Sequence, residues 1–403
     1  MKPSPAPTAA TRRLPEAVIE SFRCRYGREP TVVVRAPGRV NLLGAHIDYS
    51  EGWVMPAAID RAVWLAAAPA TGRKLHVHAL DLDQTATLEL DALPDRVPQR
   101  ANPESTWIDY PAGVAWALGE EGYRPAGMAA VFGGDVPVGA GLSASAALEV
   151  AFLLAWERLS GFELEGRERA RLGQRAENAY LNVQSGIMDQ FASIHGKADH
   201  VLFLDCRDLT CERISIPPGT VVVVADTGVR RRLADSGFNS RRAQCQEAVA
   251  ILRRDLPGIR TLRDVTVAEL ERHGPRLPEP LRSRARHAVE ECARVRAGAE
   301  ALRRRDLDAF GELMRRSHVG SRDLYEVSIP ELDTLAAAAW GVAGCYGARL
   351  AGGGFGGCLI ALAAAAAVEE LGQALTRAFT SAFGRSPVIF PCSVSDGARI
   401  VEG

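Results

Sequence analysis

Short runs of apolar and β-branched residues, separated by polar turns, predict strands through the first part of the chain. These strands are expected at residues 31–36, 62–68, 74–80, 85–90 and 128–133. Apolar residues at helical spacing predict helices at residues 15–26, 105–119, 143–159 and 167–181. A glycine-containing stretch, residues 37–50, follows the first strand directly.

The pattern changes after residue 197. Two strands are predicted at residues 200–205 and 220–226, followed by a mostly helical stretch from residue 240 to residue 340. The pattern then predicts a strand at 346–351, a second glycine cluster, an Ala-rich helix and a last strand near 388–393. Because strands and helices are mixed rather than strictly alternating, we expect an α+β fold with two domains, residues 15–205 and 206–403.

The composition is that of a globular protein with a full core. Of the 403 residues, 47% are hydrophobic and 24% are charged, and this length suits two domains. The net charge of −1 gives no reason to expect a nucleic-acid or membrane partner. The eight cysteines form no C-x-x-C pair, so reduced thiols are expected rather than disulfides or a zinc site. The first fourteen residues lack a signal-peptide core and no apolar run is long enough to span a membrane, which favours a cytoplasmic protein.

The stretch PVGAGLSASA, residues 137–146, joins a predicted strand to a predicted helix and suits a phosphate. Glycines let backbone N–H groups turn inward, and the helix start adds the positive end of its dipole. The stretch is not a Walker A loop, because no Gly-Lys-Ser/Thr follows, and it lacks the third glycine of a Rossmann fingerprint. A Gly/Ser turn that only caps the helix is the alternative. The hydroxyls of Ser143 and Ser145 can also hold Mg²⁺, which takes few protein oxygens plus phosphate.

Three segments together resemble the galactokinase subfamily of the GHMP kinases. Residues 36–49, APGRVNLLGAHIDY, are similar to the galactokinase signature and are the most specific of the three. Residues 137–146 and 350–358 (LAGGGFGGC) resemble the phosphate loop and the third motif of the wider superfamily. The order and spacing also fit, and similarity continues at residues 186–190 and 331–335.

The resemblance implies a two-domain GHMP-kinase-like fold with ATP and a sugar in the cleft between the domains. Asp189 would then accept the proton of the sugar hydroxyl, and Arg39 beside it would stabilise the transferred phosphoryl group. The implied sugar-binding positions are Ala45, His46, Asp48, Gly186 and Phe238. The implied ATP-binding positions are Gly139, Gly141, Leu142, Ser143, Ser145, Trp107 and Tyr110, and Mg²⁺ would be held by Ser145 and Glu177. An aspartate beside an arginine is expected to stay ionised and to orient the hydroxyl more than to act as a strong base.

Several of these residues also have ordinary structural explanations. Asp48 can cap a turn, and His46 can be a structural, hydrogen-bonding histidine. Glu177 falls on a predicted helix, where a solvated carboxylate is the default, and Trp107 can belong to the core. Residues 352–357 are expected to let the backbone pack closely near the site rather than to take part in chemistry.

Ala45 departs from the galactokinase pattern and leaves the identity of the sugar open. Most galactokinases have a glutamate here that contacts the C6 hydroxyl, whereas galacturonokinases resemble this chain. A C6 carboxylate facing a glutamate at about 4 Å would be repelled by roughly 4 kcal/mol at an effective dielectric constant of about 20. Alanine removes that repulsion, and the carboxylate could pair with His46 or with one of Arg230, Arg231 and Arg232. Phe238 replaces a tyrosine that usually reaches the sugar, whereas the other motifs keep the galactokinase form.

The sequence therefore predicts an ATP-dependent sugar-1-kinase. Its substrate would be D-galactose or D-galacturonate, phosphorylated on the C1 hydroxyl to give the sugar 1-phosphate and ADP. A non-catalytic galactose and ATP sensor of the same family is the alternative, although Ser143, Ser145 and Asp189 are retained. Residues 39–49 argue against a mevalonate or homoserine kinase. The expected partners are the sugar and ATP with Mg²⁺, and the protein is expected to be a monomer or a homodimer.

Overall fold

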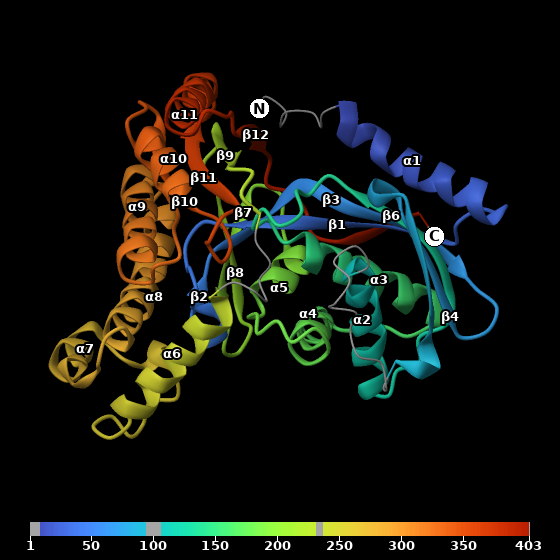
Figure 1. Cartoon of the computed structure of the whole chain (residues 1–403), viewed down its shortest axis with the longest axis horizontal. Helices are drawn as coiled ribbons and strands as arrows, with labels where there is room; N and C mark the ends of the chain where they lie inside the picture. Colours follow the sequence, from blue (N-terminus) through green and yellow to red (C-terminus); the bar gives the residue numbers. More distant parts are fainter. Residues whose placement is uncertain (1–8, 94–105, 231–236, 403) are drawn as a thin grey trace.

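The structure is a computed structural model that describes residues 9–93, 106–230 and 237–402. Figure 1 shows a first part built on a large sheet and, beside it, a second part dominated by long helices. Within the described residues the large sheet has six strands in the order β13-β1-β3-β6-β4-β5. These are β1 (Val32–Asn41), β3 (Pro56–Pro69), β4 (Lys74–Ala79), β5 (Gln84–Glu89), β6 (Met128–Gly134) and β13 (Arg399–Glu402).

Helices cover both faces of the large sheet because successive strand residues point to opposite sides. On one face Val33 packs with Val18 and Phe22 of α1 (Ala9–Tyr26), and on the other Val32 and Val34 pack against the remaining helices of this part. Each fully buried side chain of this kind contributes about 1.5–3 kcal/mol, which fixes the face that each residue takes. The covering helices are α2 (Asp109–Glu120), α3 (Ala144–Ser160), α4 (Gly166–Arg175) and α5 (Met188–His195).

The second part contains a four-stranded sheet in the order β10-β11-β9-β12 and most of the long helices. Its strands are β9 (Thr220–Asp226), β10 (Cys345–Leu350), β11 (Cys358–Ala364) and β12 (Val388–Cys392). Its helices are α6 (Phe238–Leu252), α7 (Val267–His273), α8 (Leu281–Arg303), α9 (Leu307–Asp323), α10 (Pro330–Trp340) and α11 (Val368–Phe383). A small three-stranded sheet has the strand order β2-β7-β8, formed by β2 (Trp53–Val54), β7 (His200–Asp205) and β8 (Cys211–Ser215).

The α+β class is confirmed, and most predicted elements are present with shifted ends. Helix α1 begins at Ala9 instead of residue 15, and β1 runs on to Asn41 through the glycine-containing stretch. Helix α2 begins at Asp109, after a 3-10 turn η4 (Thr106–Ile108), and residue 105 of the predicted helix lies outside the described residues. The predicted helix at 167–181 ends at Arg175 and continues as a π-helical turn, η5 (Ala176–Tyr180).

The helix predicted after the second glycine cluster is present, but the strand that precedes it was not predicted. Residues 358–364 form β11, and the helix α11 begins only at Val368. Strand β11 is paired on both edges, with β9 and β10, and is buried through Ala363. Burial in the middle of a sheet outweighs the helix preference of alanine, which is a weak local term.

The end of the chain returns to the first sheet. Strand β13 pairs with β1, with Ile400 opposite Val34, and Val394 bridges to Ile59. The domain boundary at residues 205 and 206 stays a prediction. Within the described ranges, no helix combines the length and the apolar character that crossing a membrane requires.

Candidate active site

A cavity of about 910 Å³ lies where the two parts of the fold meet. Its lining includes residues of β1, of the loop after β1, of the β6–α3 connection and of the start of α5, while Phe238, Gly352 and Gly353 come from the second part. A space of this size accommodates a sugar together with a nucleotide. Every site residue predicted from the sequence lines this one cavity, so residues from 39 to 238 converge there.

Arg39 and Asp189 form a bidentate ion pair in the lining of the cavity. The Arg39 Nε lies 2.8 Å from Asp189 Oδ1 and the Nη2 lies 2.7 Å from Oδ2. Nη1 of Arg39 donates to the carbonyl oxygen of Gly141 at 2.6 Å, and the hydroxyl of Ser143 donates to Asp189. Arg39 is 4% exposed whereas the Asp189 side chain is 25% exposed, so the carboxylate is the member of the pair that a ligand can reach. Fork-like pairs of this kind are strong and fix the orientation of both groups.

The glycine-rich loop at 137–146 forms a cradle in front of α3. Gly139, Gly141 and Ser143 have positive φ angles, of 70°, 83° and 60°, which bend the backbone around the start of the helix. Ser143 precedes the first residue of α3, but its hydroxyl contacts Asp189 instead of capping the helix. The first N–H groups of α3 therefore keep their capacity to bind an anion. This geometry favours the phosphate-loop interpretation over a simple helix cap.

The second glycine cluster, residues 352–357, packs closely against the backbone of this loop, as the sequence predicted. A side-chain carbon on Gly352 would lie 2.8 Å from the Cα of Gly141, closer than packed carbons approach. The N–H of Cys358 donates to the carbonyl oxygen of Ala140 at 3.0 Å. Only glycine at position 352 allows its backbone to pack this closely against the backbone of Gly141.

Ser145 and Glu177 lie together beside the cradle. The Ser145 hydroxyl is 3.2 Å from Glu177 Oε1, and the hydroxyl of Ser185 donates to the other carboxylate oxygen. Glu177 lies in the π-helical turn η5 and is only 4% exposed, which overturns the solvated-carboxylate explanation. Burial raises the pKa of Glu177 to about 7, although the hydrogen bonds from Ser185 and Ser145 oppose the shift.

A carboxylate with a raised pKa beside a hydroxyl suits Mg²⁺, whose charge would compensate the buried negative charge. Mg²⁺ commonly takes one or two protein oxygens and completes its shell with phosphates and water. In the part of the chain that the structure describes, no group of three or more His, Cys, Asp or Glu side chains is placed to hold a metal ion.

The loop after β1 forms another wall of the cavity. Asp48 begins the short helical turn η1 (Asp48–Ser50) and faces Gly186, where any side chain would overlap the carboxylate. Burial, and then the negative charge of Asp189, raise the pKa of Asp48 to about 6. The ring of Phe238 lies 5.4 Å from that of His46 and presents an apolar face to the cavity.

Both ring nitrogens of His46 lie within hydrogen-bond distance of other protein groups. Its Nε2 lies 3.0 Å from the carbonyl oxygen of Gly353, which can only accept, so this nitrogen carries a proton. Its Nδ1 lies 3.0 Å from the hydroxyl of Tyr49, which in turn lies 2.7 Å from that of Tyr325. These contacts agree with the structural explanation of His46, although the residue also lines the cavity.

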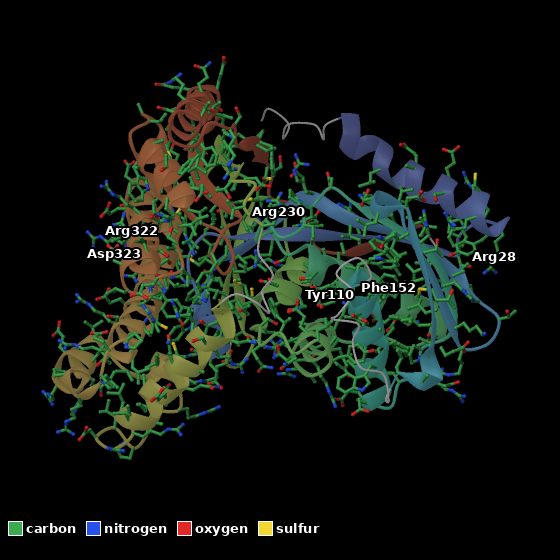
Figure 2. All side chains as sticks on the ribbon, in the orientation of Figure 1. Arg28, Tyr110, Phe152, Arg230, Arg322 and Asp323 are labelled. Atoms are coloured by element: carbon green, nitrogen blue, oxygen red, sulfur yellow. The ribbon has the colours of Figure 1, made fainter. Side chains whose placement is uncertain are left out.

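At the far end of the cavity, Trp107 and Tyr110 come from η4 and α2. The indole N–H of Trp107 donates to Gln84 Oε1 at 2.8 Å, and its ring packs 5.4 Å from that of Phe132. Tyr110, labelled in Figure 2, lies in the first part of the fold and lines the same cavity. An aromatic wall of this kind suits a nucleobase.

The cavity is acidic. Among the described residues that line it, Arg39 is the only arginine or lysine, and the carboxylates are Asp48, Asp81, Asp109, Glu177 and Asp189. Arg230 is not among the lining residues and forms an ion pair with Asp226 at 2.6 Å. Arg231 and Arg232 lie outside the described residues.

Sequence reasoning missed several side chains that act on this site. Ser185 contacts Glu177, and Asp109 is a buried lining carboxylate next to Tyr110. Glu149 and Gln190 form a buried pair, with Gln190 Nε2 2.8 Å from Glu149 Oε2, and burial raises the pKa of Glu149 well above its usual range. Glu149 follows Ser145 by four residues on the same helix, so the two side chains share one face. This spacing was the signal in the sequence that could have placed Glu149 near the site.

Comparison with known proteins assigns this arrangement to a family. The galactokinase galactose-binding signature matches residues 20–69, the GHMP kinase N-terminal domain matches residues 109–197 and the GHMP kinase C-terminal domain matches residues 299–381. A galactokinase of Roseiflexus sp. (strain RS-1) is 46% identical over 95% of this chain and 96% of its own. One of Chloroflexus aggregans (strain MD-66 / DSM 9485) is 42% identical over 95% and 97%.

Solved structures agree. The galactokinase of Lactococcus lactis, solved in complex with galactose, superposes with a TM-score of 0.88 at 32% identity and covers 95% of this chain and 99% of its own. The Methanococcus jannaschii mevalonate kinase, at 18% identity, has a TM-score of 0.62 over 92% and 100% of the two chains, which shows the shared fold alone. The chain therefore belongs to the galactokinase family of the GHMP kinases and is a galactokinase-type sugar kinase.

Proposed function

We propose that the protein transfers the γ-phosphoryl group of ATP to the C1 hydroxyl of a galactose-type hexose. The observation that carries this proposal is the ion pair of Arg39 and Asp189, fastened to the phosphate loop through Gly141 and Ser143. A carboxylate that binds a sugar hydroxyl then lies next to the backbone cradle that binds phosphates. The relatives named galactokinase, and the one solved with galactose, support the choice of sugar.

In this proposal the sugar oxygen bonds to the γ-phosphorus as the bond from that phosphorus to the bridging oxygen breaks. The hydroxyl proton passes to Asp189, and ADP is the leaving group. Arg39 holds the carboxylate in place and offsets charge on the phosphoryl oxygens, which is the main catalytic requirement of phosphoryl transfer. Because Arg39 and Ser143 already bind the Asp189 carboxylate, its main role is to orient the hydroxyl.

Ser145 and Glu177 would hold Mg²⁺, whose charge neutralises the phosphates when it is bound with ATP. The aromatic pair Trp107 and Tyr110 would contact the nucleobase. Asp48, which faces Gly186, would accept hydrogen bonds from sugar hydroxyls. Phe238 would pack against an apolar face of the sugar.

For the group on C6 we favour a neutral hydroxymethyl over a carboxylate. The only described cation of the lining is Arg39, which is already paired, and five carboxylates would repel an acidic sugar. Ala45 is the one observation that favours galacturonate, because its side chain places no negative charge on this wall of the cavity.

A coupled ADP-release assay with galactose, galacturonate, N-acetylgalactosamine and glucose tests the proposal. We expect turnover of galactose that exceeds that of galacturonate, and no turnover of any sugar would refute it. Ala45→Glu separates the two sugars further: if galacturonate is the natural substrate, this variant suppresses its turnover more than that of galactose. Equal effects on both sugars would contradict the electrostatic explanation of Ala45.

A further inference from the structure

A buried carboxylate of the second part of the fold binds the backbone of the loop after β1, which contains Ala45 and Asp48 and forms a wall of the cavity. Glu291 lies on α8 and is 0% exposed. Its Oε1 accepts the backbone N–H groups of Gly44 and Ala45, each at 2.9 Å, and the hydroxyl of Ser317 at 2.6 Å. Its Oε2 accepts from Arg294 Nε at 2.7 Å. Two adjacent residues of the cavity wall are thus bound by one side chain far away in the sequence.

Glu291 carries its charge in the folded protein. Burial acts to raise the pKa of this carboxyl, but the positive charges of Arg294 and Arg349 and the hydrogen bond from Ser317 hold it well below its usual range. A carboxylate that accepts several hydrogen bonds is a stronger acceptor than a neutral amide or hydroxyl. The loop is therefore bound by a permanent negative charge rather than by a neutral group.

The preceding turn of the same helix adds a second contact to Ala45. His287, also 0% exposed, lies with its Nε2 3.1 Å from the carbonyl oxygen of Ala45. A carbonyl only accepts, so this nitrogen donates. The backbone N–H and the backbone carbonyl of Ala45 are both hydrogen-bonded to side chains of α8. These contacts do not involve the side chain at position 45.

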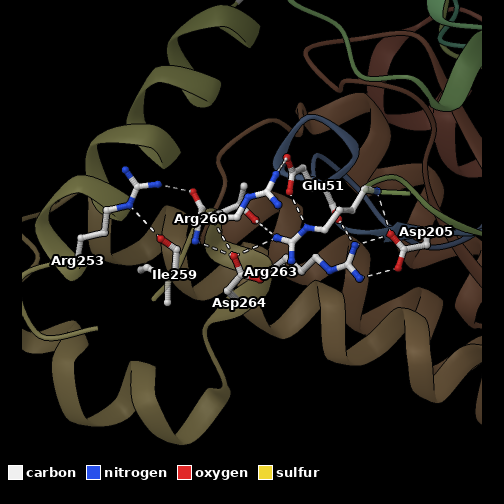
Figure 3. Close-up of polar contacts among 9 residues, drawn as sticks. Glu51, Asp205, Arg253, Ile259, Arg260, Arg263 and Asp264 are labelled. Carbon is white, nitrogen blue, oxygen red and sulfur yellow. Dashed lines mark hydrogen bonds and ion pairs between the residues drawn. The ribbon is translucent and has the colours of Figure 1, made fainter. Parts of the chain in front are cut away.

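The other end of the loop is fixed by a separate ion network, drawn in Figure 3. The carbonyl oxygen of Glu51 accepts from Arg263 Nη1 at 2.7 Å, and the Glu51 carboxylate pairs with Arg207 at 2.6 Å. Arg263 also forms an ion pair with Asp205. The segment that contains Ala45 and Asp48 is thus clamped between two anchors.

We propose that Glu291 is a positioning residue for sugar recognition, which sets the backbone of Gly44 and Ala45 and through it the placement of Asp48 against the sugar. The proposal rests on the proposed function only for the identity of the ligand. Glu291 touches neither the phosphate loop nor the nucleotide end of the cavity. Its loss is therefore expected to weaken sugar binding selectively.

The test is Glu291→Gln in the full-length protein, with Glu290→Gln as the matched control. Glutamine keeps the shape of the side chain, but it cannot accept from the loop and from Arg294 together. Glu290 is the neighbour on the same helix and pairs with Arg286 and Arg294, so its variant also loses contact with Arg294 without touching the loop. We expect Glu291→Gln to raise the KM for galactose about tenfold, with the KM for ATP within twofold of wild type. Glu290→Gln should change neither constant.

Calorimetry measures galactose binding to the same two variants and to wild type without any turnover. It separates the positioning role of Glu291 from the proposed kinase function, because a protein that binds galactose but does not turn it over would refute only the proposed function. If Glu291→Gln does not fold, His287→Leu removes the second contact to Ala45 and should raise the KM for galactose by a few fold, again with the KM for ATP unchanged. Equal effects on the sugar and ATP constants, or a lower melting temperature with both constants unchanged, would overturn the positioning role.

Discussion

Gly186→Ala is expected to disable sugar recognition without unfolding the protein. A methyl group at position 186 would lie 2.8 Å from Cβ of Asp48 and nearer still to its carboxylate, whereas packed side-chain carbons keep at least 3.0 Å. Gly186 has no left-handed backbone angle, so alanine itself causes no strain there. Rotation of the Asp48 side chain removes the overlap with the carboxylate, and a shift of a few tenths of an ångström relieves the contact with Cβ, so the cost appears as displacement of Asp48 rather than as lost packing.

The size of the effect follows from that displacement. The carboxylate has to move by about 1 Å to clear the methyl group, and a shift of that size in a positioned group costs about 100-fold in rate. This corresponds to about 2.7 kcal/mol of transition-state stabilisation. Gly119→Ala is the control, because a methyl group there meets no atom within 4 Å and Gly119 lies in the helix α2.

The assay is the coupled release of ADP at varied galactose and saturating ATP, with a thermal melt of each variant. We expect kcat/KM for galactose to fall about 100-fold in Gly186→Ala, with a melting temperature within a few degrees of wild type. Gly119→Ala should retain wild-type kinetics. A Gly186→Ala enzyme within threefold of wild type would refute the placement of Asp48 in the sugar site.

Three further predictions follow from the same geometry. Asp189→Asn should lower kcat by about 10²–10⁴-fold while calorimetry still detects galactose binding, and a variant with unchanged kcat would exclude Asp189 from proton transfer. Glu177→Gln should raise the Mg²⁺ concentration needed for half-maximal rate by about 10–100-fold; an unchanged Mg²⁺ titration would exclude Glu177 as a ligand. The pKa values of Asp48 and Glu177, raised by burial to about 6 and about 7, mean that both carboxyls become protonated as the pH falls through this range. Because both are proposed to act as carboxylates, kcat/KM should fall on the acid side of pH 7, and a profile that stays flat down to about pH 5 would contradict their roles.

The sequence predicted the members of the site better than their contacts. Short motifs record which residues a fold brings together, so the cavity contains each predicted position, from Arg39 to Phe238. The local pattern could not reveal that Glu177 lies in a π-helical turn, because such a turn depends on packing rather than on periodicity. It also gave the default of a solvated carboxylate, whereas the side chain is buried.

Contacts between distant residues explain what the sequence left out. Glu291 reads as one more charged residue on a long helix, and only the fold brings it to the backbone of Ala45. Strand β13 is four residues long and gains its stability from pairing with β1, which local propensity does not record. The alanines of β11 were missed for the same reason, because their strand conformation is fixed by pairing with β9 and β10 and not by local propensity.

The position of the phosphate on the product tests the central claim most directly. Galactose, ATP and Mg²⁺ are incubated with the protein, and the product is analysed by proton and phosphorus NMR. The account predicts a sugar 1-phosphate, in which the anomeric proton is split by coupling to phosphorus, in an amount equal to the ADP formed. Phosphate on any other oxygen, or ADP with inorganic phosphate and unchanged sugar, would contradict the placement of the C1 hydroxyl between Asp189 and the phosphate loop.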